Sequence, residues 1–309
     1  MKEYKISPND AGQRLDAFLG KVLNAPKSLI YKAIRKKRVK VNGKKSEISY
    51  KLKTQDVLQL YINDEFFNEQ KTEFPWMDLK PKLDIIYEDD NILVVNKPSG
   101  MLSQAEADEN INSLESHVRA YLYNKNEIDI ENEHTFLPSL CHRIDRNTSG
   151  LVIAAKNAES LRIINQKIRN REIKKYYICE VEGKMPNHSG EISGYISKNE
   201  RENKMYFSKT AKENSRECST RYKVLREDVR TSKLEAELIT GRTHQIRATL
   251  SYIGHPIVGD VKYGAMHNGN KSFQHLEAYK LLFDFVSDGG ILEYLNGKKI
   301  SLDLEENNG

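Results

Sequence analysis

Apolar residues near the start of the chain recur at helical spacing in two neighbouring segments. The first segment repeats at the intervals of one helix face, at Leu15, Phe18, Leu19, Val22 and Leu23. Asp10 stands before it as a candidate N-cap. Beyond Pro26, the second segment has apolar positions at Leu29, Ile30, Ala33 and Ile34 and outward positions at Lys32, Arg35 and Lys36. The pattern predicts two short helices, the second with a basic outer face.

A short sheet is predicted to follow these helices. Val39–Val41 alternates in the manner of a strand, and Asn42-Gly43 is typical of a hairpin turn because both residues tolerate positive φ. Asp56–Ile62 alternates again. Residues 12–61 therefore predict a small unit made of a helix, a turn, a basic helix and a short sheet.

Strand-like and helix-like segments alternate from Leu83 onward. The predicted strands are Leu83–Tyr87, Ile92–Asn96, Leu151–Ala155, Lys175–Val181, Arg221–Leu225 and Leu234–Ile239, and the predicted helices lie near Ser113–Tyr123, over Glu159–Arg169 and from Thr243. Several strands are joined by turns as short as Glu88–Asn91, whereas parallel neighbours need long crossovers. We therefore expect an α+β fold with a mixed, largely antiparallel sheet flanked by helices.

The expected domain organisation places the first unit at residues 1–62 and the larger one at residues 83–309. Between them, residues 63–82 show no clear periodicity and are interpreted as a linker. A chain of 309 residues is long enough for two such domains, one of them with a sizeable core.

Composition excludes several classes of protein. With 38% apolar and 30% charged residues, the chain resembles an ordinary globular protein. Its longest apolar run, Leu151–Ala155, is five residues, whereas a membrane span needs about 20. The first residues contain no apolar signal-peptide core, and the three widely spaced cysteines, Cys141, Cys179 and Cys218, form no Cys-x-x-Cys motif. We expect a cytoplasmic protein without disulfides.

Charge is distributed unevenly along the chain. Residues 1–62 contain 15 Lys/Arg and 5 Asp/Glu, a net charge of +10, whereas the remaining 247 residues carry a net charge of −5. Six of the nine residues in Lys32–Lys40 are basic. One basic helix face is often only a solvated surface. Here, however, all of the net positive charge of the chain lies in residues 1–62. This favours a module that binds a polyanion such as nucleic acid.

The first segment resembles the S4 RNA-binding module. The matching residues are Gly12–Leu19, Ser28–Ile34, Arg38–Gly43 and Asp56-Val57. The resemblance covers about the first fifth of the chain. It implies that the second helix lays its basic face on an RNA backbone, with Lys32, Arg35, Lys36, Lys37 and Arg38 as the candidate RNA-binding residues.

A first candidate for chemistry is the polar turn that precedes the apolar strand Leu151–Ala155. The segment Asp145-Arg-Asn-Thr-Ser-Gly150 has the composition of a turn, and the following strand holds it against the core. Asp145 lies between Arg143 and Arg146, which favour an ionised carboxylate of low pKa. Spacing alone leaves open the alternative that Asp145 only caps the turn.

A second candidate is Thr240–Leu250, where a strand ends and a helix begins. His244, Arg247 and Ser251 fall on one stripe of this helix, and apolar residues fall on another. Arg247 is a plausible partner for a carboxylate. The alternative is an arginine that faces RNA or solvent.

Four segments in order resemble the RluA-type family of pseudouridine synthases. They are the hairpin and Lys-Pro turn over residues 87–100, His142–Leu151, Lys175–Gly183, and Thr240–Arg247 with the following residues 254–264. The match spans about residues 83–285, and an S4-like module is a common partner of this core. The resemblance implies an S4-like domain followed by a pseudouridine synthase core.

The resemblance also implies roles for single residues. Asp145 falls on the family's catalytic aspartate, Tyr177 on its active-site tyrosine, and Arg247 on the arginine that pairs with the aspartate. Tyr176 should point to the other face of the sheet. Arg143 falls where the family can place a side chain into the space left by the flipped base. Arg146, Arg242 and His244 are further candidate RNA contacts.

The sequence departs from the family pattern at three places. Met101–Gln104 stands where many members have a Val-His-Pro-like segment, Glu277 where many have histidine, and Ile144 where leucine is commoner. None of these touches Asp145, Tyr177 or Arg247. They do weaken assignment to a particular subfamily, and therefore to a particular uridine.

The implied reaction is an isomerisation of uridine that breaks the N1–C1′ bond, turns the uracil and rejoins it through C5. One ionised carboxylate, as nucleophile or as base at the sugar, suffices. We expect no cofactor and no metal, in keeping with the lack of a glycine-rich nucleotide loop and of metal-ligand spacing. The predicted partner is structured RNA, either ribosomal RNA or transfer RNA. We expect the protein to be a monomer and not to bind a membrane.

Two alternative classes of function make different demands on the sequence. A non-catalytic RNA-binding or ribosome-assembly protein would be favoured by loss of Asp145, Tyr177 or Arg247, and all three are present. A nucleoside hydrolase would need a second placed carboxylate, and Glu88, Asp89 and Asp90 resemble turn residues instead.

Overall fold

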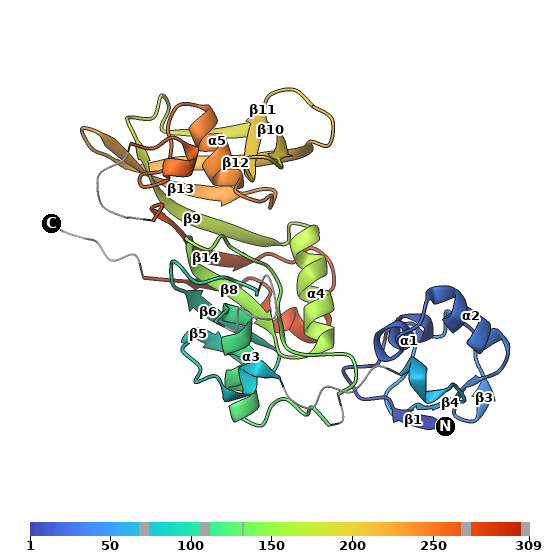
Figure 1. Ribbon diagram of the computed structural model, residues 1–309. Helices are drawn as coiled ribbons and strands as arrows, with labels where there is room; N and C mark the ends of the chain where they lie inside the picture. The colour runs from blue at the N-terminus through green and yellow to red at the C-terminus, as the bar shows by residue number, and fades with distance from the viewer. Residues whose placement is uncertain (68–73, 106–111, 132, 267–272, 304–309) are drawn as a thin grey trace. The chain divides into compact units, whose positions relative to one another are not determined.

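The computed structural model describes residues 1–67, 74–105, 112–131, 133–266 and 273–303 (Figure 1). The chain forms two compact units. The first consists of Met1–Pro81, Ser116–Ser139 and Lys156–Glu159, and the second of Lys82–Glu115, Leu140–Ala155 and Ser160–Gly309. The predicted domain boundaries at residues 62 and 82 stay a prediction. Across the described residues, no helix is long and apolar enough to cross a membrane.

The first unit contains the two predicted helices, α1 (Leu15–Val22) and α2 (Lys27–Arg35). Their apolar stripes are buried in one core, in which Phe18 and Leu19 are fully enclosed. The prediction that Asp10 caps α1 was wrong. The residue that directly precedes α1 is Arg14, and Asp10 lies too far upstream to reach the first amides of the helix. Its buried carboxylate instead accepts a hydrogen bond from the hydroxyl of Thr135.

Four strands complete this part of the first unit, in the spatial order β1-β4-β2-β3 with antiparallel pairing throughout. The bounds are Lys2–Lys5 for β1, Val39–Val41 for β2, Lys44–Lys45 for β3 and Val57–Leu60 for β4. The predicted hairpin is confirmed, because Asn42 and Gly43 join β2 to β3 with φ values of 51° and 75°. Strand β1 was not predicted, since it is an edge strand without a buried alternating face.

Residues beyond β4 in the first unit form short helical turns. They are η1 (Asp64–Phe66) and η2 (Pro75–Asp78), and Trp76 is buried in the latter. Residues 68–73 of the predicted linker lie outside the described residues. Helix α3 (Leu114–Asn124) begins in the second unit and continues into the first. Side chains of Ser7 and Asn9 also donate hydrogen bonds to Glu133, so the first unit includes segments from between the later sequence motifs.

The described part of the second unit is built on one 11-stranded sheet, in the order β11-β10-β12-β13-β9-β14-β8-β6-β5, with β15 beside β14 and β7 beside β8. The bounds are β5 Asp84–Glu88, β6 Ile92–Lys97, β7 Ser139–Leu140, β8 Ser149–Ala155, β9 Ile173–Glu182, β10 Ser189–Asn199, β11 Lys204–Ser208, β12 Arg216–Glu227, β13 Thr231–Leu238, β14 Leu276–Phe283 and β15 Lys299–Ser301. The predicted mixed, largely antiparallel sheet and the α+β class are confirmed.

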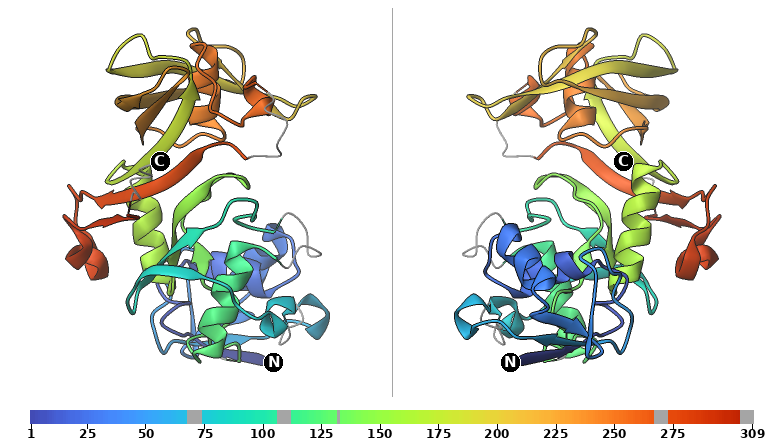
Figure 2. Two further views of the ribbon diagram at one scale, coloured as in Figure 1. Left: turned by 90° about the vertical axis from the view of Figure 1, so that its left-hand side faces the viewer. Right: turned by 90° about the vertical axis from the view of Figure 1, so that its right-hand side faces the viewer.

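Helices flank this sheet in Figures 1 and 2. Helix α4 (Ala158–Arg169) and the turn η4 (Gly290–Leu295) contribute Ile164 and Leu292 to the same core as β8 and β14. Helix α5 (Gln245–Tyr252) packs against β11, where the rings of Tyr252 and Phe207 are 4.8 Å apart. The turn η3 (Val261–Tyr263) follows α5 and returns the chain beside it. The helices predicted at 159–169 and from 243 are therefore present.

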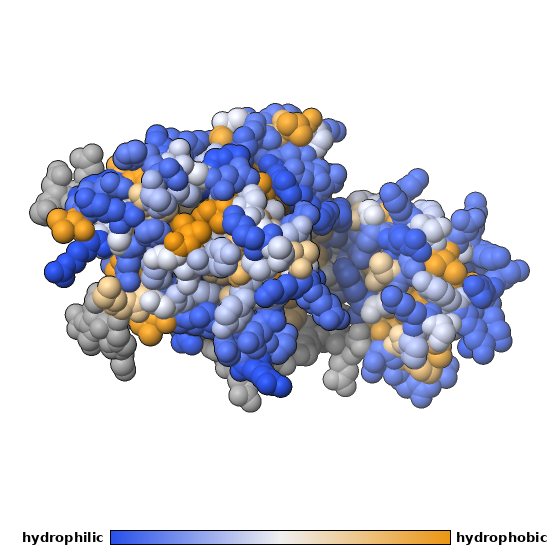
Figure 3. Space-filling view, turned by 90° about the horizontal axis from the view of Figure 1, so that it is seen from above, coloured by the Kyte–Doolittle hydropathy of each residue, from blue (hydrophilic) through white to orange (hydrophobic). Residues whose placement is uncertain are grey.

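The surface seen in Figure 3 is mostly hydrophilic, with hydrophobic side chains in separate spots. Exposed large apolar residues such as Val229 and Val286 are far apart in the sequence. Single exposed apolar side chains are normal on a protein surface.

One parallel pairing interrupts the antiparallel sheet, where β14 lies beside β8. Gly150 sits at this junction with φ of +114°, opposite Ala278. A Cβ atom at Gly150 would stand 2.3 Å from the carbonyl oxygen of Ala278. Only glycine fits this backbone approach, which sets β8 and the turn before it against β14.

Replacing Gly150 by alanine is therefore expected to destabilise the fold by at least about 2 kcal/mol, through steric overlap and a strained positive φ. Chemical unfolding of the purified variant measures this. Gly43→Ala is the matched control, because Gly43 also has a positive φ of 75° but would place its Cβ in open space. Equal losses in the two variants would contradict the role assigned to the β8–β14 contact.

Candidate active site

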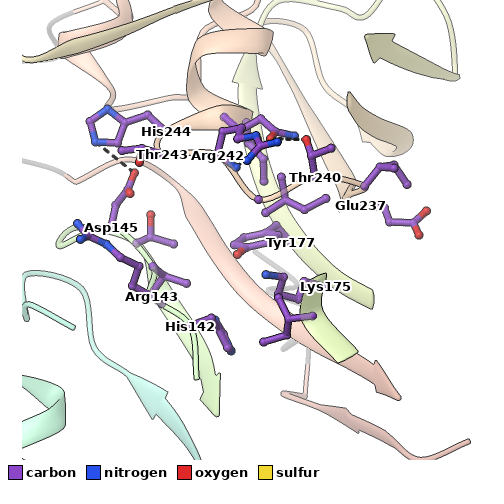
Figure 4. Close-up of a pocket in the computed structure, with 18 of the residues that line it drawn as sticks. His142, Arg143, Asp145, Lys175, Tyr177, Glu237, Thr240, Arg242, Thr243 and His244 are labelled. Carbon is purple, nitrogen blue, oxygen red and sulfur yellow. Dashed lines mark hydrogen bonds and ion pairs between the residues drawn. The ribbon is translucent and has the colours of Figure 1, made fainter. Parts of the chain in front are cut away.

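A cavity of about 700 Å³ opens in the second unit and collects half of the predicted site residues (Figure 4). Its walls come from the turn before β8, from β9, and from the loop that leads into α5. The predicted residues that line it are Arg143, Asp145, Tyr177, Arg242, His244 and Arg247. Residues separated by more than 100 positions in the sequence therefore meet around one space.

Asp145 projects into this cavity from the turn before β8. Its Oδ2 accepts a hydrogen bond from Nη1 of Arg247 at 2.9 Å, and its side chain is 21% exposed. The expectation that Arg143 and Arg146 favour an ionised carboxylate at Asp145 stays a prediction. The Nε of Arg146 donates a hydrogen bond to the carbonyl oxygen of Gly100 at 3.0 Å. Arg143 is exposed at the cavity.

Arg247, in the first turn of α5, bridges two carboxylates. Its Nε and Nη2 donate to the two oxygens of Asp260 at 2.6 and 2.8 Å, which leaves Nη1 for Asp145. Burial opposes the charge of Arg247, but Asp260 and then Asp145 outweigh it and raise the pKa of the guanidinium. A bidentate pair of this kind fixes the plane of the guanidinium. The geometry of the Asp145 contact therefore depends on Asp260.

Sequence reasoning did not assign a role to Asp260. The only signal was its place in Gly254–Asp260, within the third motif of the family resemblance. Its side chain is 2% exposed, so its charge is compensated almost entirely by Arg247.

His244 provides a second polar neighbour for Asp145. The backbone of His244, the residue that directly precedes α5, is left-handed with φ of 50°. Its Nδ1 is 2.9 Å from the hydroxyl of Tyr263, which already accepts the amide N–H of Met205. We assign the hydroxyl proton to the bond with Nδ1, which leaves the ring proton on Nε2. Nε2 is 3.7 Å from Asp145, and burial lowers the pKa of His244 despite that charge.

Tyr177 reaches the cavity from β9, and Tyr176 does not line it. The ring of Tyr176 instead lies 4.0 Å from the ammonium group of Lys280. Because side chains alternate along a strand, this matches the expected register of Tyr177. Burial and then the charge of Asp145 raise the pKa of Tyr177, so its hydroxyl is protonated at neutral pH.

Comparisons with known proteins identify this arrangement. The family model described as RNA pseudouridylate synthase matches residues 91–252, and the S4 domain model matches residues 13–58. The chain belongs to the RNA pseudouridylate synthase family. The expectation of an RluA-type synthase with an N-terminal S4 RNA-binding domain is confirmed, and the protein is an RNA pseudouridine synthase, an isomerase.

Relatives cover nearly the whole synthase. It is 36% identical over 306 residues to an uncharacterized RNA pseudouridine synthase of Mycoplasma capricolum, which covers 97% of both chains. It is 34% identical to the ribosomal large subunit pseudouridine synthase C of Vibrio vulnificus, over 87% of this chain and 85% of that one. Among solved structures, human RNA pseudouridylate synthase domain containing 1 superposes with a TM-score of 0.54 and 26% identity, covering 67% of this chain and 80% of that one.

Lys97, a buried lysine of the synthase, stabilises the turn that contains Asp145. The ammonium group of Lys97 is fully enclosed and donates to the carbonyl oxygens of Pro98, Met101 and Arg146 at 2.8 to 3.0 Å. Burial lowers the pKa of Lys97 to about 8, and Asp145 partly offsets this. The Lys-Pro turn of the family motif thus clamps the turn that carries Asp145.

Gln245 uses hydrogen bonds to hold the loop before α5, which forms another wall of the cavity. Its Oε1 accepts hydrogen bonds from the Thr240 hydroxyl and the Arg242 amide, and its Nε2 donates to Ser219 and Thr220. All four hydrogen-bonding positions of this buried amide are used. The loop before α5 is therefore held to β12.

The remaining predicted RNA-binding residues of the synthase lie in the S4 domain. Lys32, Arg35, Lys36, Lys37 and Arg38 are all exposed, on α2 and in the turn that follows it. Across the described residues, no group of three or more His, Cys, Asp or Glu side chains is placed to hold a metal ion.

Proposed function

We propose that this pseudouridine synthase modifies specific uridines of large-subunit ribosomal RNA, with Asp145 as its catalytic carboxylate. The observation that carries the chemical assignment is the ion pair of Asp145 with Arg247 in a cavity walled by Tyr177. The RNA class is supported by relatives at about one-third identity named ribosomal large subunit pseudouridine synthase C.

Asp145 acts at the ribose of the target uridine in this proposal. The N1–C1′ bond breaks and its electron pair leaves with the uracil. The uracil turns, a C5–C1′ bond forms, C5 loses its proton and N1 gains one. Either action of Asp145, as nucleophile or as base, requires an ionised carboxylate. Arg247 favours that charge and orients it, while Asp260 prevents Arg247 from rotating.

The base leaves the RNA stack to reach Asp145, at a cost of about a few kcal/mol. Stacking of the flipped uracil on Tyr177 offsets part of this cost. Arg143, exposed at the cavity, is placed to enter the space that the base vacates. Arg242 and His244 line the other wall, where they would contact the same nucleotide or its neighbours.

Pseudouridine mapping in total RNA tests the substrate. A strain lacking the gene should lose pseudouridine at one or more positions of large-subunit ribosomal RNA. The wild-type gene should restore them, and a gene encoding Asp145→Asn should not. If pseudouridine is lost only from transfer RNA, the assignment to ribosomal RNA is wrong, while the assignment of the reaction still holds.

The basic face of α2 is proposed to lie on the RNA backbone. Substituting Lys32, Arg35 and Lys36 with glutamine in the full chain should weaken RNA binding. The slope of log K against log salt should flatten by about 0.7–0.9 for each phosphate that is no longer neutralised. Fluorescence anisotropy across a salt series measures this. Arg35→Lys keeps the charge and should keep the slope. An unchanged slope in the triple variant would mean that α2 faces solvent and the second unit alone holds the RNA.

A further inference from the structure

Lys175 places a cation in the cavity for which the described residues supply no partner. It lies on β9 two residues before Tyr177, so both side chains project from the same face of the strand (Figure 4). Its ammonium group makes no hydrogen bond or ion pair with any residue that the structure describes. By contrast, Lys174 pairs with Asp284, and Arg221 pairs with Glu237. Lys175 is partly buried, and an ammonium group that loses water without gaining a partner is destabilised. A ligand that accepts its hydrogen bond would relieve that cost.

The surroundings leave this ammonium group open to the cavity. A Cβ atom at position 241 would stand 3.7 Å from Nζ of Lys175, and Gly241 leaves that space empty. His142 on the other wall is neutral, since burial and the charge of Lys175 lower its pKa to about 3. Its Nε2 accepts the amide N–H of Ile153 and is not available to Lys175. Burial lowers the pKa of Lys175 to about 8, so at pH 7 the amine is still mainly protonated.

We propose that Lys175 donates a hydrogen bond to the O4 carbonyl of the target uridine, as a catalytic and base-selecting residue. The inference rests on the proposed function, in which Asp145 meets the ribose. In Figure 4, Tyr177 lies between Asp145 and Lys175. A uracil stacked on Tyr177 with its C1′ at Asp145 directs its far edge, which carries O4, toward Lys175.

This contact would act on the reaction itself. When the N1–C1′ bond breaks, the electron pair left on uracil is shared by N1, O2 and, through the C5–C6 double bond, O4. An ammonium group at O4 stabilises that charge more than it stabilises neutral uridine, which accelerates bond cleavage.

The Lys175 ammonium group, in the same position, can also donate a hydrogen bond to the product, pseudouridine. Turning uracil about the axis through N3 and C6 exchanges N1 with C5 and O2 with O4. A donor that contacts O4 of uridine then contacts O2 of pseudouridine. Lys175 therefore would hold the detached ring before, during and after it turns.

The contact would also exclude cytidine. Cytosine carries an amino group in place of O4, so two donors would face each other and both would lose their partners. A site built to hydrogen-bond one group rejects an analogue that cannot accept that bond.

A double-mutant cycle between Lys175 and O4 tests the proposal. The RNA is the short oligonucleotide that carries the mapped uridine, prepared also with pyrimidin-2-one, which lacks O4, at that position. Dissociation constants are measured with the full chain in the Asp145→Asn background. We expect the loss of O4 to weaken binding about 10-fold or more when Lys175 is present, and to have no effect in Lys175→Met. Equal weakening in both proteins would overturn the contact.

Turnover gives a second, independent measurement. In the chain that retains Asp145, Lys175→Met should lower the single-turnover rate by about 10- to 100-fold, and Lys175→Arg should recover part of it. Lys233→Met is the control, because Lys233 is partly buried on β13 and lies outside the cavity. If Lys175→Met fails to fold, an unchanged affinity of the Asp145→Asn protein for RNA without O4 still overturns the proposal. A mapped uridine in transfer RNA would overturn the ribosomal assignment and leave this test unchanged.

Discussion

Replacing Asp145 by asparagine is expected to lower pseudouridine formation by more than about 10³-fold, the scale on which loss of a catalytic group acts. The change keeps the shape of the side chain and its place beside Arg247, and it removes the charge that acts at the ribose. Release of tritium from RNA labelled at C5 of uridine measures turnover.

RNA binding is the control for this variant. Affinity should change little, because the basic face of α2 and the other cationic residues at the cavity are untouched. Turnover within about tenfold of the wild type would remove Asp145 from the proposed role.

Replacing Arg247 by leucine is expected to abolish turnover and to destabilise the fold by about 3–5 kcal/mol, since it leaves a buried carboxylate without its partner. That carboxylate belongs to Asp260, whose side chain is 2% exposed. Asp145 is 21% exposed and can be hydrated when the arginine is absent. Chemical denaturation gives the loss of stability, and the tritium assay gives the turnover.

The double variant Arg247→Leu, Asp260→Leu separates the two effects. It removes both members of the buried pair, so it should regain most of the lost stability. Turnover should stay low, because Asp145 still lacks the group that orients it. Recovery of activity together with stability would mean that Arg247 serves only the fold.

Local patterns in the sequence were sufficient for much of the fold. The apolar stripes of α1, α2 and α4 predicted those helices, and Asn42-Gly43 predicted its hairpin. Glu88–Asn91 predicted the antiparallel pairing of β5 with β6, and the Asp89 carboxylate indeed accepts the amides of Asn91 and Ile92 within that turn. These features depend on neighbours within a few residues, which is the range that periodicity reports.

The features that were missed depend on distant parts of the chain. Strand β10 has a half-exposed alternation of serine, glycine and polar residues, so only its pairing with β11 and β12 defines it. Asp145 was matched with the arginines beside it in sequence, whereas its partner lies 102 residues away. Asp260 makes its contact 13 residues beyond Arg247, a spacing that no helical or strand period connects. The family resemblance supplied the pairing of Asp145 with Arg247, which spacing alone left open.

Strand β14 has a consequence for the order in which the synthase is made. It lies between β8 and β9 and pairs with both, although it follows them in the chain by about a hundred residues. While the chain leaves the ribosome, the half-sheet ending at β8 and the half-sheet beginning at β9 are both complete before the strand that joins them exists. The facing edge of β9 and the start of β8, at Ser149 and Gly150, stay unpaired until β14 has emerged, which exposes them to wrong partners. A product of premature termination before Leu276 would therefore lack the strand that joins the half-sheet next to Asp145 to the half-sheet that carries Tyr177.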